Sequence, residues 1–421
     1  MPTSPDFKPT PVLTKRIPED RAQRKTVWFD QYVATGGYKT LERVLSMQPG
    51  EITDQVKAAI LRGRGGAGFP AGLKWSFLSP PDGGPRYLAI NCDEAEPGTF
   101  KDRLLVDFDP HAVLEGIAIA AYACQMQTAY FFIRGEYHHQ AKVFQKALEE
   151  AYANGIFGKQ GLMRGASKFA VEVVLHRSAG AYICGEETAI FNSIEGYRGE
   201  PRNKPPFPVE VGVFGKPTLV NNVETLVNVL SIVKDGGSAY AALGTEGSKG
   251  RKLFCLSGAV AKPGIYEVEF GITLRQLIDL GGGMRNGSTM QAILLGGAAG
   301  GFVGPNDLDL PLTMEATRAA GSSLGSGVVM VLDQSVDMVD QLRRIAAFFR
   351  DESCGQCVPC RVGTVRQEEI VSRLAKGVQS QDIELLRELG TVMRDASICG
   401  LGQTANSAID SAINKLKVFA V

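Results

Sequence analysis

Four cysteines near the C-terminus have the spacing of an iron–sulfur site. Cys354, Cys357 and Cys360 follow one another at intervals of three residues, and Cys399 lies further along the chain. Three thiolates from so short a segment can reach one cluster, because each interval spans at most about 10 Å of extended chain. Since such clusters are held by four thiolates, Cys399 is the natural fourth ligand. A zinc site is the alternative, although zinc ligands more often come as two separated pairs.

A glycine-rich stretch at residues 62–75 is a candidate binding loop for a phosphate or for a flat aromatic ring. A G-x-G-x-x-G spacing begins at Gly63, but the preceding residues 53–60 have helical rather than strand character. Backbone without side chains can still bring its N–H groups close to a phosphate or a flat aromatic ring. Arg64 and Lys74 would add positive charge. A flexible surface loop is the alternative.

Two further loops carry carboxylates directly after predicted strands. Residues 91–103 follow a strand predicted at 87–90, and residues 180–188 follow one predicted at 170–175. Ligands of open α/β sheets bind at the carboxyl ends of the strands, so both loops are site candidates. Solvated acidic loops that cap helices are the alternative.

The elements that must position these motifs fall into three successive types. Residues 1–245 alternate β-like runs with helical patterns, which indicates an α/β layered domain. Residues 246–333 have the pattern of a compact α+β unit similar to ubiquitin, and residues 334–421 that of a helical bundle carrying the cysteines. The predicted strands are at 87–90, 130–134, 170–175, 252–256, 265–268 and 292–295. The predicted helices are at 110–125, 138–153, 273–280, 336–349, 364–376, 382–394 and 402–418.

The composition restricts the function classes. Lys and Arg together number 45, as do Asp and Glu, so no field attracting nucleic acid or a membrane surface is implied. The most apolar stretch, at 113–123, contains Glu115 and is far shorter than the roughly 20 residues that span a bilayer. The first 25 residues resemble neither a signal peptide nor a transit peptide, so the cytoplasm is the expected compartment. There, a dense cysteine loop indicates metal binding rather than disulfides.

Together, these segments carry a family resemblance that covers nearly all 421 residues. The chain resembles the flavin-bearing, NADH-oxidising (51-kDa, F-type) subunits of respiratory complex I, the NADH:quinone oxidoreductase. The motifs concerned are at residues 62–75, 91–103, 181–189, 204–208, 215–217, 221–225 and 352–361, with Cys399. The resemblance implies a Rossmann-like FMN domain, a ubiquitin-like (β-grasp, SLBB-type) domain and a C-terminal four-helix bundle with one [4Fe–4S] cluster.

The resemblance also implies which residues would bind the cofactors. NADH would lie over the flavin with aromatic rings against its adenine, and Glu96 and Glu187 would act on the nicotinamide and ribose side as the catalytic residues. The implied FMN-binding residues are Gly63, Arg64, Gly65, Lys74, Asn91, Asp93, Glu94, Tyr182, Gly185, Glu186, Asn221, Asn222 and Thr225. The implied NADH-binding residues are Phe69, Lys74, Phe77, Glu96, Glu187, Lys204 and Phe207. The implied cluster ligands are Cys354, Cys357, Cys360 and Cys399. Core packing is the alternative for the three phenylalanines.

The implied reaction is hydride transfer from NADH to FMN, then single-electron transfer to the cluster and onward to quinone. Because the cofactors carry this chemistry, the protein must chiefly align them, and no catalytic histidine is expected. The implied partners are a thioredoxin-like [2Fe–2S] subunit and a large iron–sulfur subunit. Any membrane contact, on the cytoplasmic face, would be made through other subunits.

Other functions remain to be weighed against this one. A diaphorase subunit of an NAD-linked hydrogenase or formate dehydrogenase often carries a thioredoxin-like domain in front, whereas here the glycine-rich loop begins by residue 62. A flavin-less iron–sulfur scaffold would not need the glycine and carboxylate loops. A membrane-associated, ion-pumping electron carrier would have two ferredoxin-type cysteine runs, and this chain has one. Cys92 stands where the family more often has alanine. It is expected to pack in the core, as are Cys124, Cys184 and Cys255.

Overall fold

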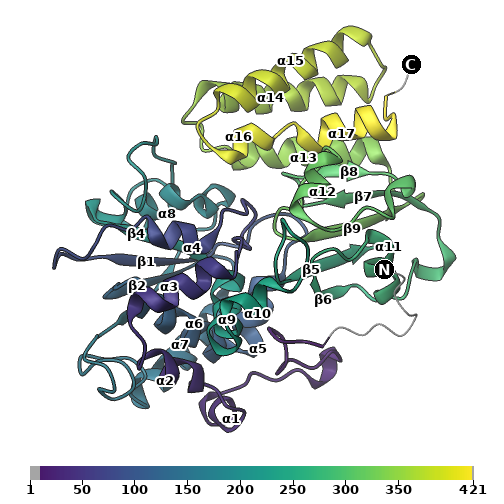
Figure 1. The fold of residues 1–421 in the computed structure, drawn as a ribbon. Coiled ribbons are helices and arrows are strands. Elements are labelled where there is room, and N and C mark those ends of the chain that lie inside the picture. The colour runs from purple at the N-terminus through teal and green to yellow at the C-terminus, as the bar shows by residue number, and fades with distance from the viewer. Residues whose placement is uncertain (1–9, 420–421) are drawn as a thin grey trace.

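The computed structural model describes residues 10–419, which form two sheets and a helical bundle (Figure 1). The first sheet is parallel and has four strands in the order β3-β2-β1-β4. The second is mixed and has five strands in the order β6-β5-β9-β7-β8. The strands are β1 Tyr87–Cys92, β2 Thr128–Ile133, β3 Glu172–Arg177, β4 Thr218–Asn222, β5 Arg251–Gly258, β6 Gly264–Glu269, β7 Met290–Leu295, β8 Gly301–Val303 and β9 Val328–Asp333.

The first sheet has a strand order that creates a ligand-binding crevice. From β1, the sheet extends through β2 and β3 on one side and through β4 on the other. Ligands of open α/β sheets bind at such a switch point, beyond the carboxyl ends of the two strands that flank it. The helices around this sheet are α1 Phe29–Ala34, α2 Lys39–Val44, α3 Pro49–Ala58, α4 Ala71–Ser76, α5 Lys101–Phe108, α6 Pro110–Ala123, α7 His138–Ala153, α8 Glu187–Ile194, α9 Val223–Asp235 and α10 Gly237–Ala241. The apolar α6 contacts β2, α7 and α9 and is buried almost throughout.

The second sheet has its own apolar core. Strand β5 lies between antiparallel β6 and parallel β9, and α11 Leu274–Leu280 begins after Thr273, whose hydroxyl accepts from the N–H of Gln276 at 3.2 Å. The predicted sequence of two strands, a helix and a strand is confirmed. The structure adds β8, β9 and α12 Met314–Ala319. In the first sheet, β2 and β3 lie within two residues of the predicted ranges.

The helical bundle lies beside the second sheet, where α17 contacts β8 (Figure 1). Its helices are α13 Met338–Glu352, α14 Val358–Leu374, α15 Ser380–Ala396, α16 Gly400–Thr404 and α17 Ser407–Leu416. The predicted fold class is thus confirmed. No helix within residues 10–419 is both long and apolar enough to cross a membrane.

Two predictions about the bundle are wrong in detail. The helix predicted at 364–376 begins at Val358, because Pro359 has a backbone angle suited to the first turn of a helix. The helix predicted at 402–418 is two helices, separated at Ala405 and Asn406. Asparagine favours such breaks, since its side chain competes with the helix for backbone hydrogen bonds.

An N-terminal strap, residues 12–28, ties the two sheets together. Glu267 on β6 accepts hydrogen bonds of 2.8–2.9 Å from the backbone N–H groups of residues 12–14. Further along the strap, Arg16 donates to Asp109, the residue before α6, at 3.0 Å. The strap therefore links the edge of the second sheet to the helices that cover the first.

Candidate functional site

The loop after β1 and the end of β4 leave unpartnered polar atoms in the crevice. Both carboxylate oxygens of Asp93 and the amide nitrogen of Asn221 are buried without a hydrogen-bond partner. Gly185 lies beside them, since a Cβ placed on it would be 3.7 Å from a carboxylate oxygen of Asp93. An unpaired buried polar group costs about 1–3 kcal/mol, so these atoms indicate a ligand. The ring amide and ribityl hydroxyls of FMN are partners of the right kind, and the residues present therefore fit the implied cofactor.

Burial changes the charge of Asp93. Loss of solvation raises the pKa of its carboxyl group to about 8; Arg134 opposes this effect, while Glu136 and Glu352 add to it. In the ligand-free chain, Asp93 is therefore mostly protonated at neutral pH. A neutral carboxyl group can both donate and accept a hydrogen bond.

This protonation predicts a pH dependence of stability that Asp93→Asn should remove. A free aspartate has a pKa near 4, so between about pH 4 and 8 the folded chain holds a proton that the unfolded chain has lost. The unfolding free energy of the flavin-free chain should therefore fall as pH rises through this window, by up to about 1.4 kcal/mol per pH unit from this group. Urea unfolding at pH 5 to 8 measures it. Equal slopes for the wild type and Asp93→Asn would contradict the prediction.

Some of the implied FMN residues are occupied by protein partners. The carboxylate of Glu94 accepts from the backbone N–H groups of residues 102–103 at 2.7 and 3.1 Å, and from the hydroxyl of Tyr137 at 2.9 Å. The amide of Asn222 donates to the carboxylate of Asp102 at 2.7 Å. These side chains shape the crevice by fixing α5 and the end of β4.

The expectation that Arg64 supplies charge to a ligand is not supported. Its guanidinium is fully buried and donates to the hydroxyl of Tyr240 and the carbonyl of Lys249, both at 2.9 Å. It also lies over the ring of Phe270, 4.7 Å from the centroid. Its backbone N–H donates to the hydroxyl of Thr225 at 2.9 Å. Arg64 therefore anchors the glycine-rich loop to the protein interior.

The glycine-rich loop reaches the crevice from outside the sheet. It joins α3 to α4, so its position after a helix is as predicted. A Cβ on Gly65 would be only 3.3 Å from the Cβ of Asn222, and the N–H of Gly63 donates to the carbonyl of Phe69 at 2.9 Å. Bare backbone therefore lies against the end of β4.

Glu187 forms a charged cluster with two lysines at the edge of the crevice. Its carboxylate accepts from the ammonium groups of Lys74 and Lys204, each at 2.6 Å. Burial alone would raise the pKa of Glu187, but the two lysines outweigh it and hold the pKa at about 2. Lys204 also donates to Glu186 at 3.1 Å, and Glu186 caps the N-terminus of α8. The partly exposed ammonium groups can meet the polar parts of a nucleotide.

Glu96 lies where both sheets and the bundle converge. It accepts from the hydroxyl of Tyr182 at 2.6 Å and from the backbone N–H of Ala299, after β7, at 3.1 Å. Tyr182 begins the short helix η2 Tyr182–Gly185. The centroid of its ring lies 5.1 Å from that of Phe348 on α13. Burial raises the pKa of Glu96 above its usual range. The hydrogen bonds from Tyr182 and Ala299 oppose this effect without cancelling it.

The three implied adenine-binding phenylalanines are not core residues. Phe69, Phe77 and Phe207 are 47, 52 and 52% exposed. The rings of Phe69 and Phe77 lie 6.2 Å apart. Core packing is therefore excluded for all three, and the first two form a paired aromatic surface.

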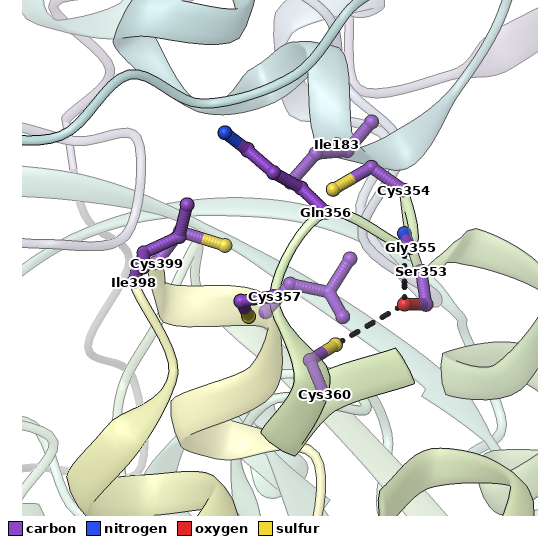
Figure 2. Close-up of a pocket in the computed structure, with 10 residues that line it drawn as sticks. Ile183, Ser353, Cys354, Gly355, Gln356, Cys357, Cys360, Ile398 and Cys399 are labelled. Carbon is purple, nitrogen blue, oxygen red and sulfur yellow. Dashed lines mark hydrogen bonds between the residues drawn. The ribbon is translucent and has the colours of Figure 1, made fainter. Parts of the chain in front are cut away.

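The four predicted cluster ligands line one pocket (Figure 2). Cys354 and Cys357 lie between α13 and α14, and Cys399 lies directly before α16. Cys360 was expected in a loop but lies in the first turn of α14. In the part of the chain that the structure describes, no three Cys, His, Asp or Glu side chains are arranged to hold one metal ion. A four-iron cluster takes one thiolate on each iron, so its ligands can stand further apart than those of a single zinc ion.

The contacts of several residues around the cysteines were not predicted from the sequence. Glu352 accepts from the backbone N–H of Tyr182 at 2.9 Å, and Arg198 donates to the carbonyl of Cys354 at 2.7 Å. Ser353 lies beside Cys360. Glu352 and Ser353 lie within the motif at 352–361 but were given no role of their own, whereas nothing in the sequence marks Arg198. The other four cysteines, Cys92, Cys124, Cys184 and Cys255, are buried.

Comparison with family models matches all three parts of the chain. Residues 56–231 match the Nuo51 FMN-binding domain, and residues 253–305 match the SLBB domain. Residues 340–418 match the NADH-ubiquinone oxidoreductase-F iron–sulfur binding region. The first match includes the crevice, and the last includes all four clustered cysteines.

Similar proteins align over nearly the whole chain. The F-type subunit of the NADH-quinone oxidoreductase of Aquifex aeolicus (strain VF5) is 43% identical over 405 residues, 96% of this chain and 92% of that one. NADP-reducing hydrogenase subunit HndC of Solidesulfovibrio fructosivorans is 41% identical over 388 residues, 92% of this chain and 78% of that one. The crystal structure of an NAD+-reducing [NiFe]-hydrogenase in its H2-reduced state aligns with a TM-score of 0.82 at 35% identity, covering 96% of this chain and 69% of that chain. The chain belongs to the family of F-type subunits of NADH-quinone oxidoreductase.

Proposed function

We propose that the chain oxidises NADH at the crevice beyond β1 and β4 and passes the electrons to a [4Fe–4S] cluster on its four clustered cysteines. It would thereby serve as the NADH dehydrogenase subunit of an NADH:quinone oxidoreductase. When bound, FMN supplies the chemistry that accepts a hydride and releases electrons singly. The protein's residues hold, orient and enclose the reactants.

One observation carries this proposal: η2 forms a wall shared by the two sites. At one end of η2, Gly185 approaches the unpartnered Asp93. Near its other end, Ile183 lines the pocket of the four cysteines. Electrons would therefore leave the crevice through a wall only one short helix thick.

The residue roles follow from which groups are available. Asp93 and Asn221 would bind the flavin through their unpartnered atoms, and Gly63, Gly65 and Gly185 would let backbone approach it. The residues that would hold these groups in place are Arg64, Asn91, Glu94, Glu186, Asn222 and Thr225. The residues facing the nucleotide would be Phe69, Lys74, Phe77, Glu96, Glu187, Lys204 and Phe207. Tyr182, whose hydroxyl donates to Glu96, would remain on the flavin side. The cluster ligands would be Cys354, Cys357, Cys360 and Cys399.

The domain boundaries, partners and location are part of the same proposal. Boundaries near residues 245 and 333 are supported by the connections between α10 and β5 and between β9 and α13. The homologues are subunits, so the chain functions in a multi-subunit complex. We propose a thioredoxin-like [2Fe–2S] subunit and a large iron–sulfur subunit as its neighbours, at the cytoplasmic face of the membrane.

An anaerobic titration with NADH tests the function. Flavin absorbance in the FMN-loaded chain should bleach stoichiometrically with NADH, and the iron–sulfur absorbance should follow. NADPH serves as the comparison nucleotide. A preparation with FMN and cluster that does not respond to NADH would refute the proposal and favour an iron–sulfur scaffold.

A hydrogenase-linked diaphorase is the second candidate, because two of the similar proteins belong to hydrogenases. The flavin half of the reaction would be the same, so the NADH titration does not separate the two functions. The purified native complex does: H2 should leave its flavin oxidised, whereas quinone should reoxidise flavin already reduced by NADH. Bleaching of the flavin by H2 would assign the chain to the hydrogenase branch.

The exposed aromatic pair predicts a substrate-affinity effect. Phe77→Ala should raise KM for NADH about tenfold with little change in kcat, because base stacking on an aromatic ring contributes about 1–3 kcal/mol in both the ground and transition states. Phe214→Ala is the matched control. Phe214 is 50% exposed but packs on Tyr87 and Tyr130. Steady-state NADH:ferricyanide kinetics measures both variants, and equal KM values would contradict the prediction.

A further inference from the structure

A serine hydroxyl touches one of the four clustered cysteines. The Oγ of Ser353 lies 3.2 Å from the Sγ of Cys360, and the backbone N–H of Gly355 donates to the same Oγ at 3.3 Å (Figure 2). Both contacts are within the wall of the cysteine-lined pocket. The hydroxyl therefore has one partner on each side, a backbone donor and a sulfur.

The direction of the hydroxyl bond follows from these two partners. A lone pair of Oγ already accepts from Gly355, which leaves the Ser353 proton free to point elsewhere. A cysteine that ligates iron is a thiolate and has no proton to give. The hydroxyl must therefore be the donor and the sulfur of Cys360 the acceptor.

Hydrogen bonds hold the backbone on both sides of Ser353 in place. Its own N–H donates to the carbonyl of Phe349 at 3.1 Å and closes α13. On one side, Glu352 is bound to Tyr182 of η2. On the other, Arg361 donates to the carbonyl of Gly355 at 2.8 Å. The chain is thus held by hydrogen bonds before Ser353, at Glu352, and after it, at Gly355.

We infer that Ser353 is a positioning residue that raises the reduction potential of the cluster through its hydrogen bond to Cys360. An electron added to a cluster increases the negative charge on its sulfur atoms, and a donor to sulfur stabilises that state. A cluster with a higher potential draws electrons from the flavin more strongly. The inference rests on the proposed function in so far as the cysteines hold a [4Fe–4S] cluster.

The test compares the cluster potential of three variants with that of the wild type in the purified complex. Ser353→Ala removes the donor, Ser353→Thr retains a hydroxyl, and Ser372→Ala changes a serine of α14 outside the pocket. Redox titrations with chemical mediators, followed by EPR of the reduced cluster, give the midpoint potentials. We expect a lower midpoint potential and a changed EPR line shape in Ser353→Ala alone, with iron content unchanged.

Three outcomes would overturn the inference. The first is a Ser353→Ala cluster with full iron content and the wild-type potential; the second is the same downward shift in Ser353→Thr, which would indicate disturbed packing. If Ser353→Ala does not assemble its cluster, pulsed EPR of the wild type in H2O and D2O decides. The inference then requires that this spectrum show a strongly coupled exchangeable proton. The third overturning outcome is a spectrum without that proton. Because the mediators replace NADH, failure of the NADH titration would not affect this test.

Discussion

Replacing Cys399 with alanine is expected to abolish the cluster and the electron transfer that depends on it. Cys399 is the one proposed ligand outside the run at 354–360, and it lies in the wall of the pocket directly before α16. A cluster deprived of one of its four thiolates loses iron readily, because three ligands leave one iron open to solvent. We expect bound iron to fall from about four atoms per chain to near zero, and NADH-driven quinone reduction by the complex to fall at least about 100-fold.

The matched control is Cys124→Ala. Cys124 is also a buried cysteine, but it follows α6 and lies outside the pocket. It should retain iron and quinone reduction. Iron analysis and EPR of the two variants give the result, and a Cys399→Ala chain with a full complement of iron would show that the fourth ligand is not Cys399.

The second large effect is expected at Lys101, in a buried charge network behind the crevice. Its ammonium group lies 2.8 Å from Asp102 and 2.9 Å from Glu224, and all three side chains are at most 4% exposed. Lys252 of the second sheet lies 3.6 Å from the same carboxylate of Glu224. Removing one partner of a buried ion pair leaves an uncompensated charge and costs about 3–5 kcal/mol. Lys101→Met should therefore lose that much unfolding free energy.

Urea unfolding followed by far-UV circular dichroism measures the loss. Lys234→Met is the control, because Lys234 is 63% exposed and its contact with Asp235 is 3.8 Å long. The control variant should change the unfolding free energy by less than about 0.5 kcal/mol. A change in Lys101→Met no larger than that of the control would show that the network is dispensable.

Lys101 also donates to Asn222, at 3.3 Å, so Lys101→Met should weaken FMN binding too.

Local sequence patterns were sufficient to predict those helices whose position depends on residues close to one another in the chain. The apolar run of α6 depends only on neighbouring residues, and that helix lies within two residues of its predicted range at 110–125. The start of α14 was placed six residues late, because the cysteine run was interpreted as a loop although Pro359 suits a first helical turn. The break at Asn406 was missed because a helical pattern continues across it.

The candidate site was less predictable, since side-chain direction depends on contacts far apart in the chain. Arg64 has the sequence context of a phosphate ligand, yet Tyr240 and Phe270 draw its guanidinium inward. Glu94 resembles a cofactor ligand but binds the first turn of α5. Asp93, one residue earlier, is the carboxylate that remains without a partner. Nothing in the spacing of these residues separates a group that supports the site from one that faces it.

The hydrogen bonds between the N-terminal strap and Glu267 have a consequence for biosynthesis. The donors at residues 12–14 leave the ribosome early, but their acceptor follows 253–255 residues later. Since domains fold in order as they emerge, the first sheet must assemble while this part of the strap has no docking site. Contacts between such distant residues are slow to form, because a long loop must close first. The strap is therefore expected to dock late in translation, after β6 has emerged and joined the second sheet.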